Sequence, residues 1–73
     1  MTNYTTEHYT EDTAIANEVF RIHFRRFRHL RDDLVQEAVI ELFKRRLQFA
    51  GKSTYKTYAT RIAKTTMLFA LRA

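Results

Sequence analysis

The sequence of 73 residues contains no cysteine, no proline and only one glycine. Without cysteine the chain cannot form a disulfide or a thiolate metal site, and a reducing compartment is compatible with this composition. The scarcity of proline and glycine favours helices over tight hairpins. No apolar run approaches the roughly 20 residues that a membrane-spanning helix needs, and the polar first ten residues do not resemble a signal peptide. We therefore predict a small all-α domain located in the cytoplasm.

Patterns typical of catalysis and metal binding are also missing. His8, His23 and His29 lack the spacing of metal ligands, and a single glycine cannot build a phosphate-binding loop. Asp32 and Asp33 are adjacent and do not face each other on a helix, so helix capping explains them better than acid–base chemistry. We expect no enzymatic activity, no cofactor and no metal site.

Charge is distributed unevenly along the chain, whose net charge is +5. All eight Asp and Glu residues lie at or before Glu41, whereas residues 42–73 carry eight Lys and Arg residues and no acid. A block of one sign is typical of contact with a polyanion such as nucleic acid, although a solvated basic surface has the same composition. The pattern favours a nucleic-acid contact in the second half and a different role for the first half.

Apolar periodicity predicts a first helix after a flexible leader of residues 1–11. Asp12 or Thr13 is expected to cap this helix, which runs to about His29. Its apolar positions recur at steps of three and four residues and are Ala16, Val19, Phe20, Phe24, Phe27 and Leu30. A parallel basic row consists of Arg21, Arg25 and Arg28. This amphipathic pattern indicates a core face and a solvated face.

Two further helices complete the predicted domain of residues 12–73, a compact three-helix bundle. The second opens at Asp32 and Asp33, where carboxylates complement the helix dipole, and a loop around Gly51 follows it. The third runs from about Thr54 to Leu71, capped by Ser53 or Thr54. Apolar positions of the second helix are Val35, Ala38, Val39, Leu42 and Phe43. Those of the third are Tyr55, Tyr58, Ala59, Ile62, Ala63, Thr66, Phe69 and Ala70, and its last turns, Met67–Leu71, are apolar all round.

Two segments resemble region 2 of the bacterial sigma-70 family. Residues 33–44 read DLVQEAVIELFK, similar to a helix of that region, and residues 49–64 read FAGKSTYKTYATRIAK, similar to a segment of the extracytoplasmic-function branch. Capped amphipathic helices often produce strings like the first one, so the argument depends on finding both segments at a family-like separation. The resemblance extends from about Phe20 to Arg72.

The resemblance implies that the helix of the first segment binds the clamp helices, a coiled coil, of the RNA polymerase β′ subunit. The residues expected to bind the polymerase are Asp33, Gln36, Glu37, Ile40 and Phe43. This role explains why an acidic, glutamine-bearing helix occurs in a basic protein.

The same resemblance implies that the second segment binds and melts the −10 promoter element and captures bases of the non-template strand. Aromatic side chains stack on bases, and Lys and Arg hold phosphates. The residues expected to bind DNA are Phe49, Lys52, Ser53, Tyr55, Lys56, Tyr58, Arg61, Lys64 and Thr65. Phe49 and the two tyrosines are also compatible with a role in the core, and Arg61 with an ion pair to an acid of the second helix.

Several departures from the family pattern qualify the resemblance. Ala59 follows Tyr58 where primary factors often have a second aromatic residue, which puts unaided strand separation in doubt. Val39 and Thr65 stand where relatives often have Asn. A region 4, the helix-turn-helix that reads the −35 element, is expected on a separate subunit, with a fragment of a longer factor as the alternative.

Two other classes of function stay open. The first is an RNA polymerase-binding regulator or decoy that does not itself bind DNA, against which the basic second half argues. The second is a helix-turn-helix DNA-binding protein, which the long connection between the second and third helices disfavours.

Overall fold

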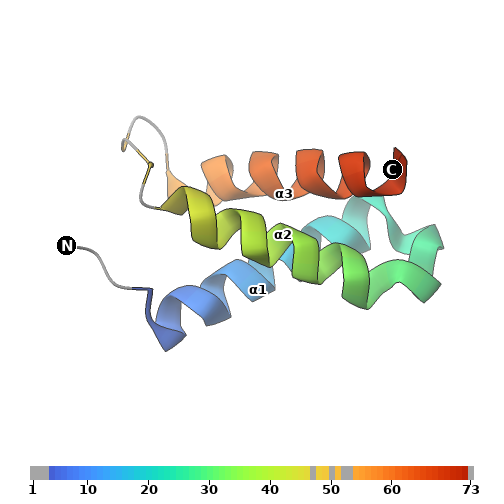
Figure 1. Ribbon diagram of the computed structural model, residues 1–73, viewed down its shortest axis with the longest axis horizontal. Coiled ribbons are helices and arrows are strands. Elements are labelled where there is room, and N and C mark those ends of the chain that lie inside the picture. Colours follow the sequence, from blue (N-terminus) through green and yellow to red (C-terminus); the bar gives the residue numbers. More distant parts are fainter. Residues whose placement is uncertain (1–3, 47, 50, 52–53, 73) are drawn as a thin grey trace.

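Figure 1 shows helices packed side by side in a bundle, which confirms the predicted all-α, three-helix fold. The computed structural model describes residues 4–46, 48–49, 51 and 54–72. Its elements are α1 (Thr6–His23), the 3-10 helix η1 (Arg25–Leu30), α2 (Arg31–Arg46) and α3 (Tyr55–Arg72), and these ranges contain no strand.

Different elements lie at the two ends of the bundle. The start of α1 and the connection between α2 and α3 lie at one of them, and η1 and the end of α3 lie at the other (Figure 1). We call the first the α2–α3 end (residues 4–12, 45–46, 48–49, 51 and 54–58) and the second the η1 end (residues 21–33 and 66–72). The longest dimension of the molecule is 37 Å.

The first helix begins at Thr6, so the predicted cap at Asp12 or Thr13 is wrong. Thr5 is the N-cap: its hydroxyl accepts a hydrogen bond from the His8 N–H at 3.2 Å, and His8 Nδ1 accepts one from the Thr5 N–H at 3.2 Å. This is a capping box with His in the place that Glu or Gln usually takes. Residues 6–11 of the predicted leader are therefore helical, and residues 1–3 lie outside the described ranges.

The first helix also ends earlier than predicted, at His23 rather than near His29. Phe24 leaves helical geometry (φ −129°, ψ 20°), and a second irregular residue, Phe27 (φ −95°, ψ 41°), lies inside η1. Phe24 is buried, and Phe27 and Leu30 pack against the core. A straight helix would carry these apolar side chains past the bundle, whereas the bend returns them to it.

The boundaries of the other two helices agree with the sequence. Asp32 and Asp33 lie in the first turn of α2, as predicted. Thr54 Oγ1 accepts a hydrogen bond from the Thr57 N–H at 3.2 Å, which confirms Thr54 of the two predicted caps of α3. Gly51, in the connection, has φ 77°, in the left-handed region that favours glycine.

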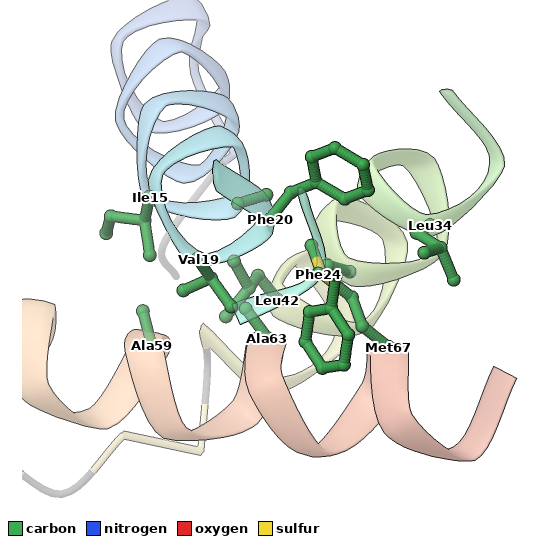
Figure 2. Packing of buried hydrophobic residues seen from close by; sticks show 11 residues of the cluster. Ile15, Val19, Phe20, Phe24, Leu34, Leu42, Ala59, Ala63 and Met67 are labelled. Atoms are coloured by element: carbon green, nitrogen blue, oxygen red, sulfur yellow. The ribbon is translucent and has the colours of Figure 1, made fainter. Parts of the chain in front are cut away.

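Side chains from all three helices meet in one core (Figure 2). Alanines at the contact surfaces of α2 and α3 are fully buried and let the helix backbones approach closely. The buried apolar residues are Ile15, Ala16, Val19 and Phe20 of α1, Phe24 between α1 and η1, Leu34, Ala38 and Leu42 of α2, and Ala59, Ala63 and Met67 of α3.

Phe69, which the sequence placed on the apolar side of the third helix, points outward instead and is 64% exposed. Phe43 belongs to the apolar row of the second helix and is also expected to bind the polymerase, and it is 52% exposed. On α3 the buried row runs through every fourth residue to Met67, so that Phe69, two positions further on, faces away. In the last turns of α3, which are apolar all round, Met67 is buried, whereas Leu68 and Phe69 are exposed.

Candidate functional site

The outer face of α2 carries all five residues that the sequence predicted to bind RNA polymerase. The helix buries Leu34, Ala38 and Leu42 against the bundle. The five predicted residues are exposed and follow one another at helical steps: Asp33, Gln36, Glu37, Ile40 and Phe43. Ile40 is 41% exposed. The face therefore combines carboxylates, an amide and apolar side chains, as protein-binding surfaces do.

Shallow grooves flank this face on both sides. Gln36 and Ile40 border a groove of about 570 Å³ beside α1, together with Tyr9. They also border a groove of about 550 Å³ beside the end of α3, which Asp33, Glu37 and Leu71 help to line. The exposed face of α2 thus forms a ridge between two grooves.

The N-terminal segment reaches one edge of this face. The rings of Tyr4 and Phe43 lie edge to face, with centroids 4.7 Å apart and an interplanar angle of 76°. Sequence reasoning missed this contact because it assigned Tyr4 to a leader.

An aromatic cluster joins the α2–α3 connection to the start of α3. The Phe49 centroid lies 5.5 Å from that of Tyr55 and 5.1 Å from that of Tyr58, and the two tyrosine rings are 6.2 Å apart. All three side chains are half-buried. The structure therefore brings together the three aromatic residues that the sequence predicted to bind DNA. Lys52 and Ser53, predicted for the same site, lie outside the described ranges.

Asp12 is a buried acid that ties the α2–α3 end together. It is 0% exposed. Its carboxylate accepts hydrogen bonds from the Tyr4 hydroxyl at 2.6 Å, the Tyr55 hydroxyl at 2.7 Å and Arg46 at 3.0 Å. We call these four residues the Asp12 network. Charged hydrogen bonds of this kind satisfy an acid that burial would otherwise destabilise.

Arg46 completes this arrangement. Its guanidinium also binds Glu11 Oε1 at 2.7 Å and lies 4.0 Å from the centroid of the Tyr55 ring. Burial opposes its charge, but the hydrogen bonds to Glu11 and Asp12 outweigh that effect and raise the pKa of Arg46. Burial, followed by the hydrogen bond to Asp12, raises the pKa of the Tyr55 hydroxyl.

These contacts divide the predicted aromatic residues by their roles. Tyr55 holds a buried acid with its hydroxyl and is covered by Arg46, so it contributes directly to the fold. The Tyr58 hydroxyl makes one long hydrogen bond, 3.5 Å to the Arg45 carbonyl oxygen. Of the two tyrosines, Tyr58 is the less constrained and the better placed to contact another molecule.

The predicted polar DNA-binding residues of α3 are all exposed but do not lie in one cluster. Arg61 and Thr65 line a groove toward α2 together with Glu37 and Glu41. The ion pair on this side of α2 joins Glu41 and Arg45 at 2.7 Å, and within the described ranges Arg61 makes none. The other two residues are Lys56 and Lys64.

A local signal for the Asp12 network exists in the sequence. Asp12 precedes Ile15, Ala16 and Val19 at steps of three, four and seven, so it lies on the buried face of α1. An acid in line with an apolar row predicts a buried carboxylate that needs a partner. Two of its three partners, Arg46 and Tyr55, lie 34 and 43 residues away and carry no local signal.

Comparison with protein families places this arrangement in a known group. The sequence model of Sigma-70 region 2 matches residues 12–73, which covers all of α2 and α3 and most of α1. The chain belongs to the sigma-70 region 2 family. No curated protein and no solved structure gave a significant match.

Membership of the sigma-70 region 2 family establishes the general role. Sigma-70 region 2 is a non-enzymatic domain of transcription initiation factors, and its partners are RNA polymerase and promoter DNA. In the described ranges, no three His, Asp or Glu side chains gather as a metal site would require. The helices of this part of the chain are too short or too polar to cross a membrane.

Proposed function

We propose that this sigma-70 region 2 domain binds the clamp helices of the RNA polymerase β′ subunit through the exposed face of α2. The observation that carries the proposal is the continuous exposure of the five predicted residues, of which Gln36 and Ile40 border both grooves. Helices pack by placing ridges of side chains into grooves. A ridge flanked by two grooves suits a coiled coil, whose own two helices present a groove between two ridges.

The chemistry of the α2 face supports a protein partner. Ile40 and Phe43 offer apolar area that water covers in the free chain, and their burial would stabilise the complex. Gln36 and Glu37 supply polar groups that fix register and exclude wrong partners. The acidic character of this face disfavours nucleic acid as its ligand.

For DNA we propose a contact through α3 and the preceding connection. Phe49 and Tyr58 supply an aromatic surface for unpaired bases of the −10 element, and Lys56 and Lys64 hold phosphates. Tyr55 positions this surface through the Asp12 network. The separate region 4-containing subunit remains a prediction, which mass spectrometry of proteins that co-purify with RNA polymerase tests.

Substitution of the α2 face tests the proposal. We expect Gln36→Ala with Glu37→Ala to weaken capture of a β′ clamp-helix fragment by about tenfold, because interface polar groups that lose their partners typically cost 1–3 kcal/mol. Surface plasmon resonance measures the affinity, and circular dichroism checks that the helices persist.

The matched control is Thr10→Ala with Glu18→Ala, which removes one neutral and one acidic exposed side chain from α1. Unchanged clamp binding of the α2 variant, or an equal loss in the control, refutes this interface. Clamp binding without any affinity for single-stranded −10 DNA would assign the chain to the regulator or decoy class.

A further inference from the structure

Four arginines surround a groove at the η1 end that neither proposed surface uses. The groove measures about 730 Å³ and lies between α1, η1 and the start of α2. The arginines, here called the groove arginines, are Arg21, Arg25, Arg28 and Arg31. All four are exposed.

The bend after α1 builds this groove. Arg21 comes from the last turn of α1, Arg25 and Arg28 from η1, and Arg31 from the first turn of α2. Arg25 and Arg28 lie on either side of the irregular residue Phe27, and both line the groove. Arg31 closes the groove with a 3.4 Å hydrogen bond to Asn17 Oδ1 of α1.

The charge of the groove arginines is not neutralised within the described part of the chain. The ion pairs found there belong to Arg45 and Arg46. Glu18 is the one acid among the described residues that line the groove. Four cations facing one anion repel each other, and a bound polyanion would relieve that repulsion.

The lining of the groove indicates which polyanion fits. The apolar residues that line it are Ala14, which is small, and Phe20, which is buried in the core. The lining thus lacks an exposed aromatic ring for stacking on a base and a large apolar anchor of the kind that dominates protein interfaces. Guanidinium groups match the geometry of phosphate oxygens.

We propose that the groove arginines form a second DNA-binding site, which holds the phosphate backbone of double-stranded DNA without reading sequence. This site lies at the end of the bundle opposite the Phe49–Tyr58 cluster (Figure 1). It extends the proposed function, because the α3 surface contacts unpaired bases and the groove contacts paired DNA beside them.

A charge-matched pair of variants tests the site in the full chain. Arg21→Gln with Arg25→Gln removes two groove charges, and Lys44→Gln with Arg72→Gln removes two exposed charges outside the groove. Fluorescence anisotropy measures binding to a blunt duplex and to a single strand over a salt series. Loss of two phosphate contacts should reduce the slope of log affinity against log salt for the duplex by about 1.8.

The expected result is a loss of duplex affinity of about tenfold at low salt for the groove variant, with less than about a twofold change in the control. Arg21→Lys with Arg25→Lys, which keeps the charge, should lose less and confirms that folding is intact. Equal losses in groove and control variants would show a general charge effect and overturn the site. Unchanged duplex binding with weaker binding of poly-glutamate would assign the groove to an acidic protein and also overturn it.

The two proposals fail separately in this experiment. Lys56→Gln with Lys64→Gln should weaken single-strand binding whatever the groove does. If that variant loses affinity and the groove variant does not, the α3 surface stands and the groove proposal falls. Capture of the β′ clamp fragment should be the same for the groove variant and the unmodified chain.

Discussion

The two ends of the bundle use arginine in opposite ways. At the α2–α3 end, Arg46 is held between Glu11 and the buried Asp12 and covers the ring of Tyr55. At the η1 end, the groove arginines point into solvent and form no ion pairs among the described residues. The charge of Arg46 at the α2–α3 end is therefore paired with acids of the chain, whereas the groove arginines at the η1 end are exposed and accessible to another molecule.

The difference follows from where the acids lie. A buried carboxylate must be paired, and the pairing determines which cation stays inside. Asp12 lies on the apolar face of α1 and takes Arg46 from α2 and a tyrosine from α3. No acid lies on a buried face among residues 21–33 and 66–72, so no ion pair holds the groove arginines in the fold, and Arg31 has a hydrogen bond to Asn17 in its place. Arginine is therefore part of the buried network at the α2–α3 end and is left exposed at the η1 end.

Of the substitutions that test this comparison of the two ends, removal of the buried acid Asp12 should have the largest effect on stability. We expect Asp12→Ala to lower the free energy of unfolding by about 3 kcal/mol, because it leaves Arg46 and two tyrosine hydroxyls without their shared partner. A domain of this size has a total stability of about 3–5 kcal/mol, so the variant should be largely unfolded in mild urea. Urea titration followed by circular dichroism measures the change.

Asp32→Ala is the matched control for that experiment. Asp32 is exposed in the first turn of α2, where loss of a carboxylate costs about 0.3–1 kcal/mol through the helix dipole. Equal destabilisation by the two substitutions would mean that the Asp12 network contributes nothing beyond an ordinary surface charge.

A smaller effect should separate the two tyrosines of the aromatic cluster. We expect Tyr55→Phe to cost about 1.5–2 kcal/mol, since it removes a hydrogen bond to a buried carboxylate. Tyr58→Phe should cost less than about 0.5 kcal/mol, because its 3.5 Å bond is at the limit of hydrogen-bond geometry. Thermal unfolding of both variants checks this order, and a reversed order would make Tyr58 the structural residue.

The smallest expected effect is that of alkaline pH, which ionises the hydroxyls of Tyr4 and Tyr55 at the α2–α3 end. Burial, and then the hydrogen bond to Asp12, raise the pKa of Tyr4 and Tyr55 above their ordinary value of 10.0. The two tyrosines therefore ionise less readily in the folded chain than in the unfolded one. Their contribution to the free energy of unfolding is complete below pH 10 and declines as the pH rises further. Melting temperatures measured from neutral to alkaline pH should fall less in a Tyr4→Phe, Tyr55→Phe double variant. A parallel fall in both proteins would contradict the assignment.

Local sequence patterns predicted α2 and α3 well and α1 poorly. The cap of α3 and the apolar rows of α2 and α3 consist of residues three or four apart, which a periodic pattern reveals. The break at Phe24 carries no proline or glycine, and the cap at Thr5 uses His8 in place of the usual Glu or Gln. Both features of α1 depend on how its side chains fit the bundle rather than on local preference.

In the candidate site, too, features within one helix were predictable from the sequence, and contacts between distant parts of the chain were not. The exposed face of α2 was predictable, because its residues belong to one helix and match a family motif. The constraint on Tyr55 was not, because it arises from an acid 43 residues earlier in the chain. Arg21, Arg25 and Arg28 were predicted as a row on one helix, but a bend that the sequence does not signal was needed to bring Arg31 beside them.

The position of Asp12 has a practical consequence for anyone who shortens this protein. The family match starts at residue 12, which invites cloning from that point. A truncated version would lose Tyr4, Glu11 and the opening turns of α1, and its new amino group would lie directly beside the carboxylate at the centre of the network. The folded unit therefore extends upstream of the region that the family model matches, and expression trials should include Tyr4 and the residues after it.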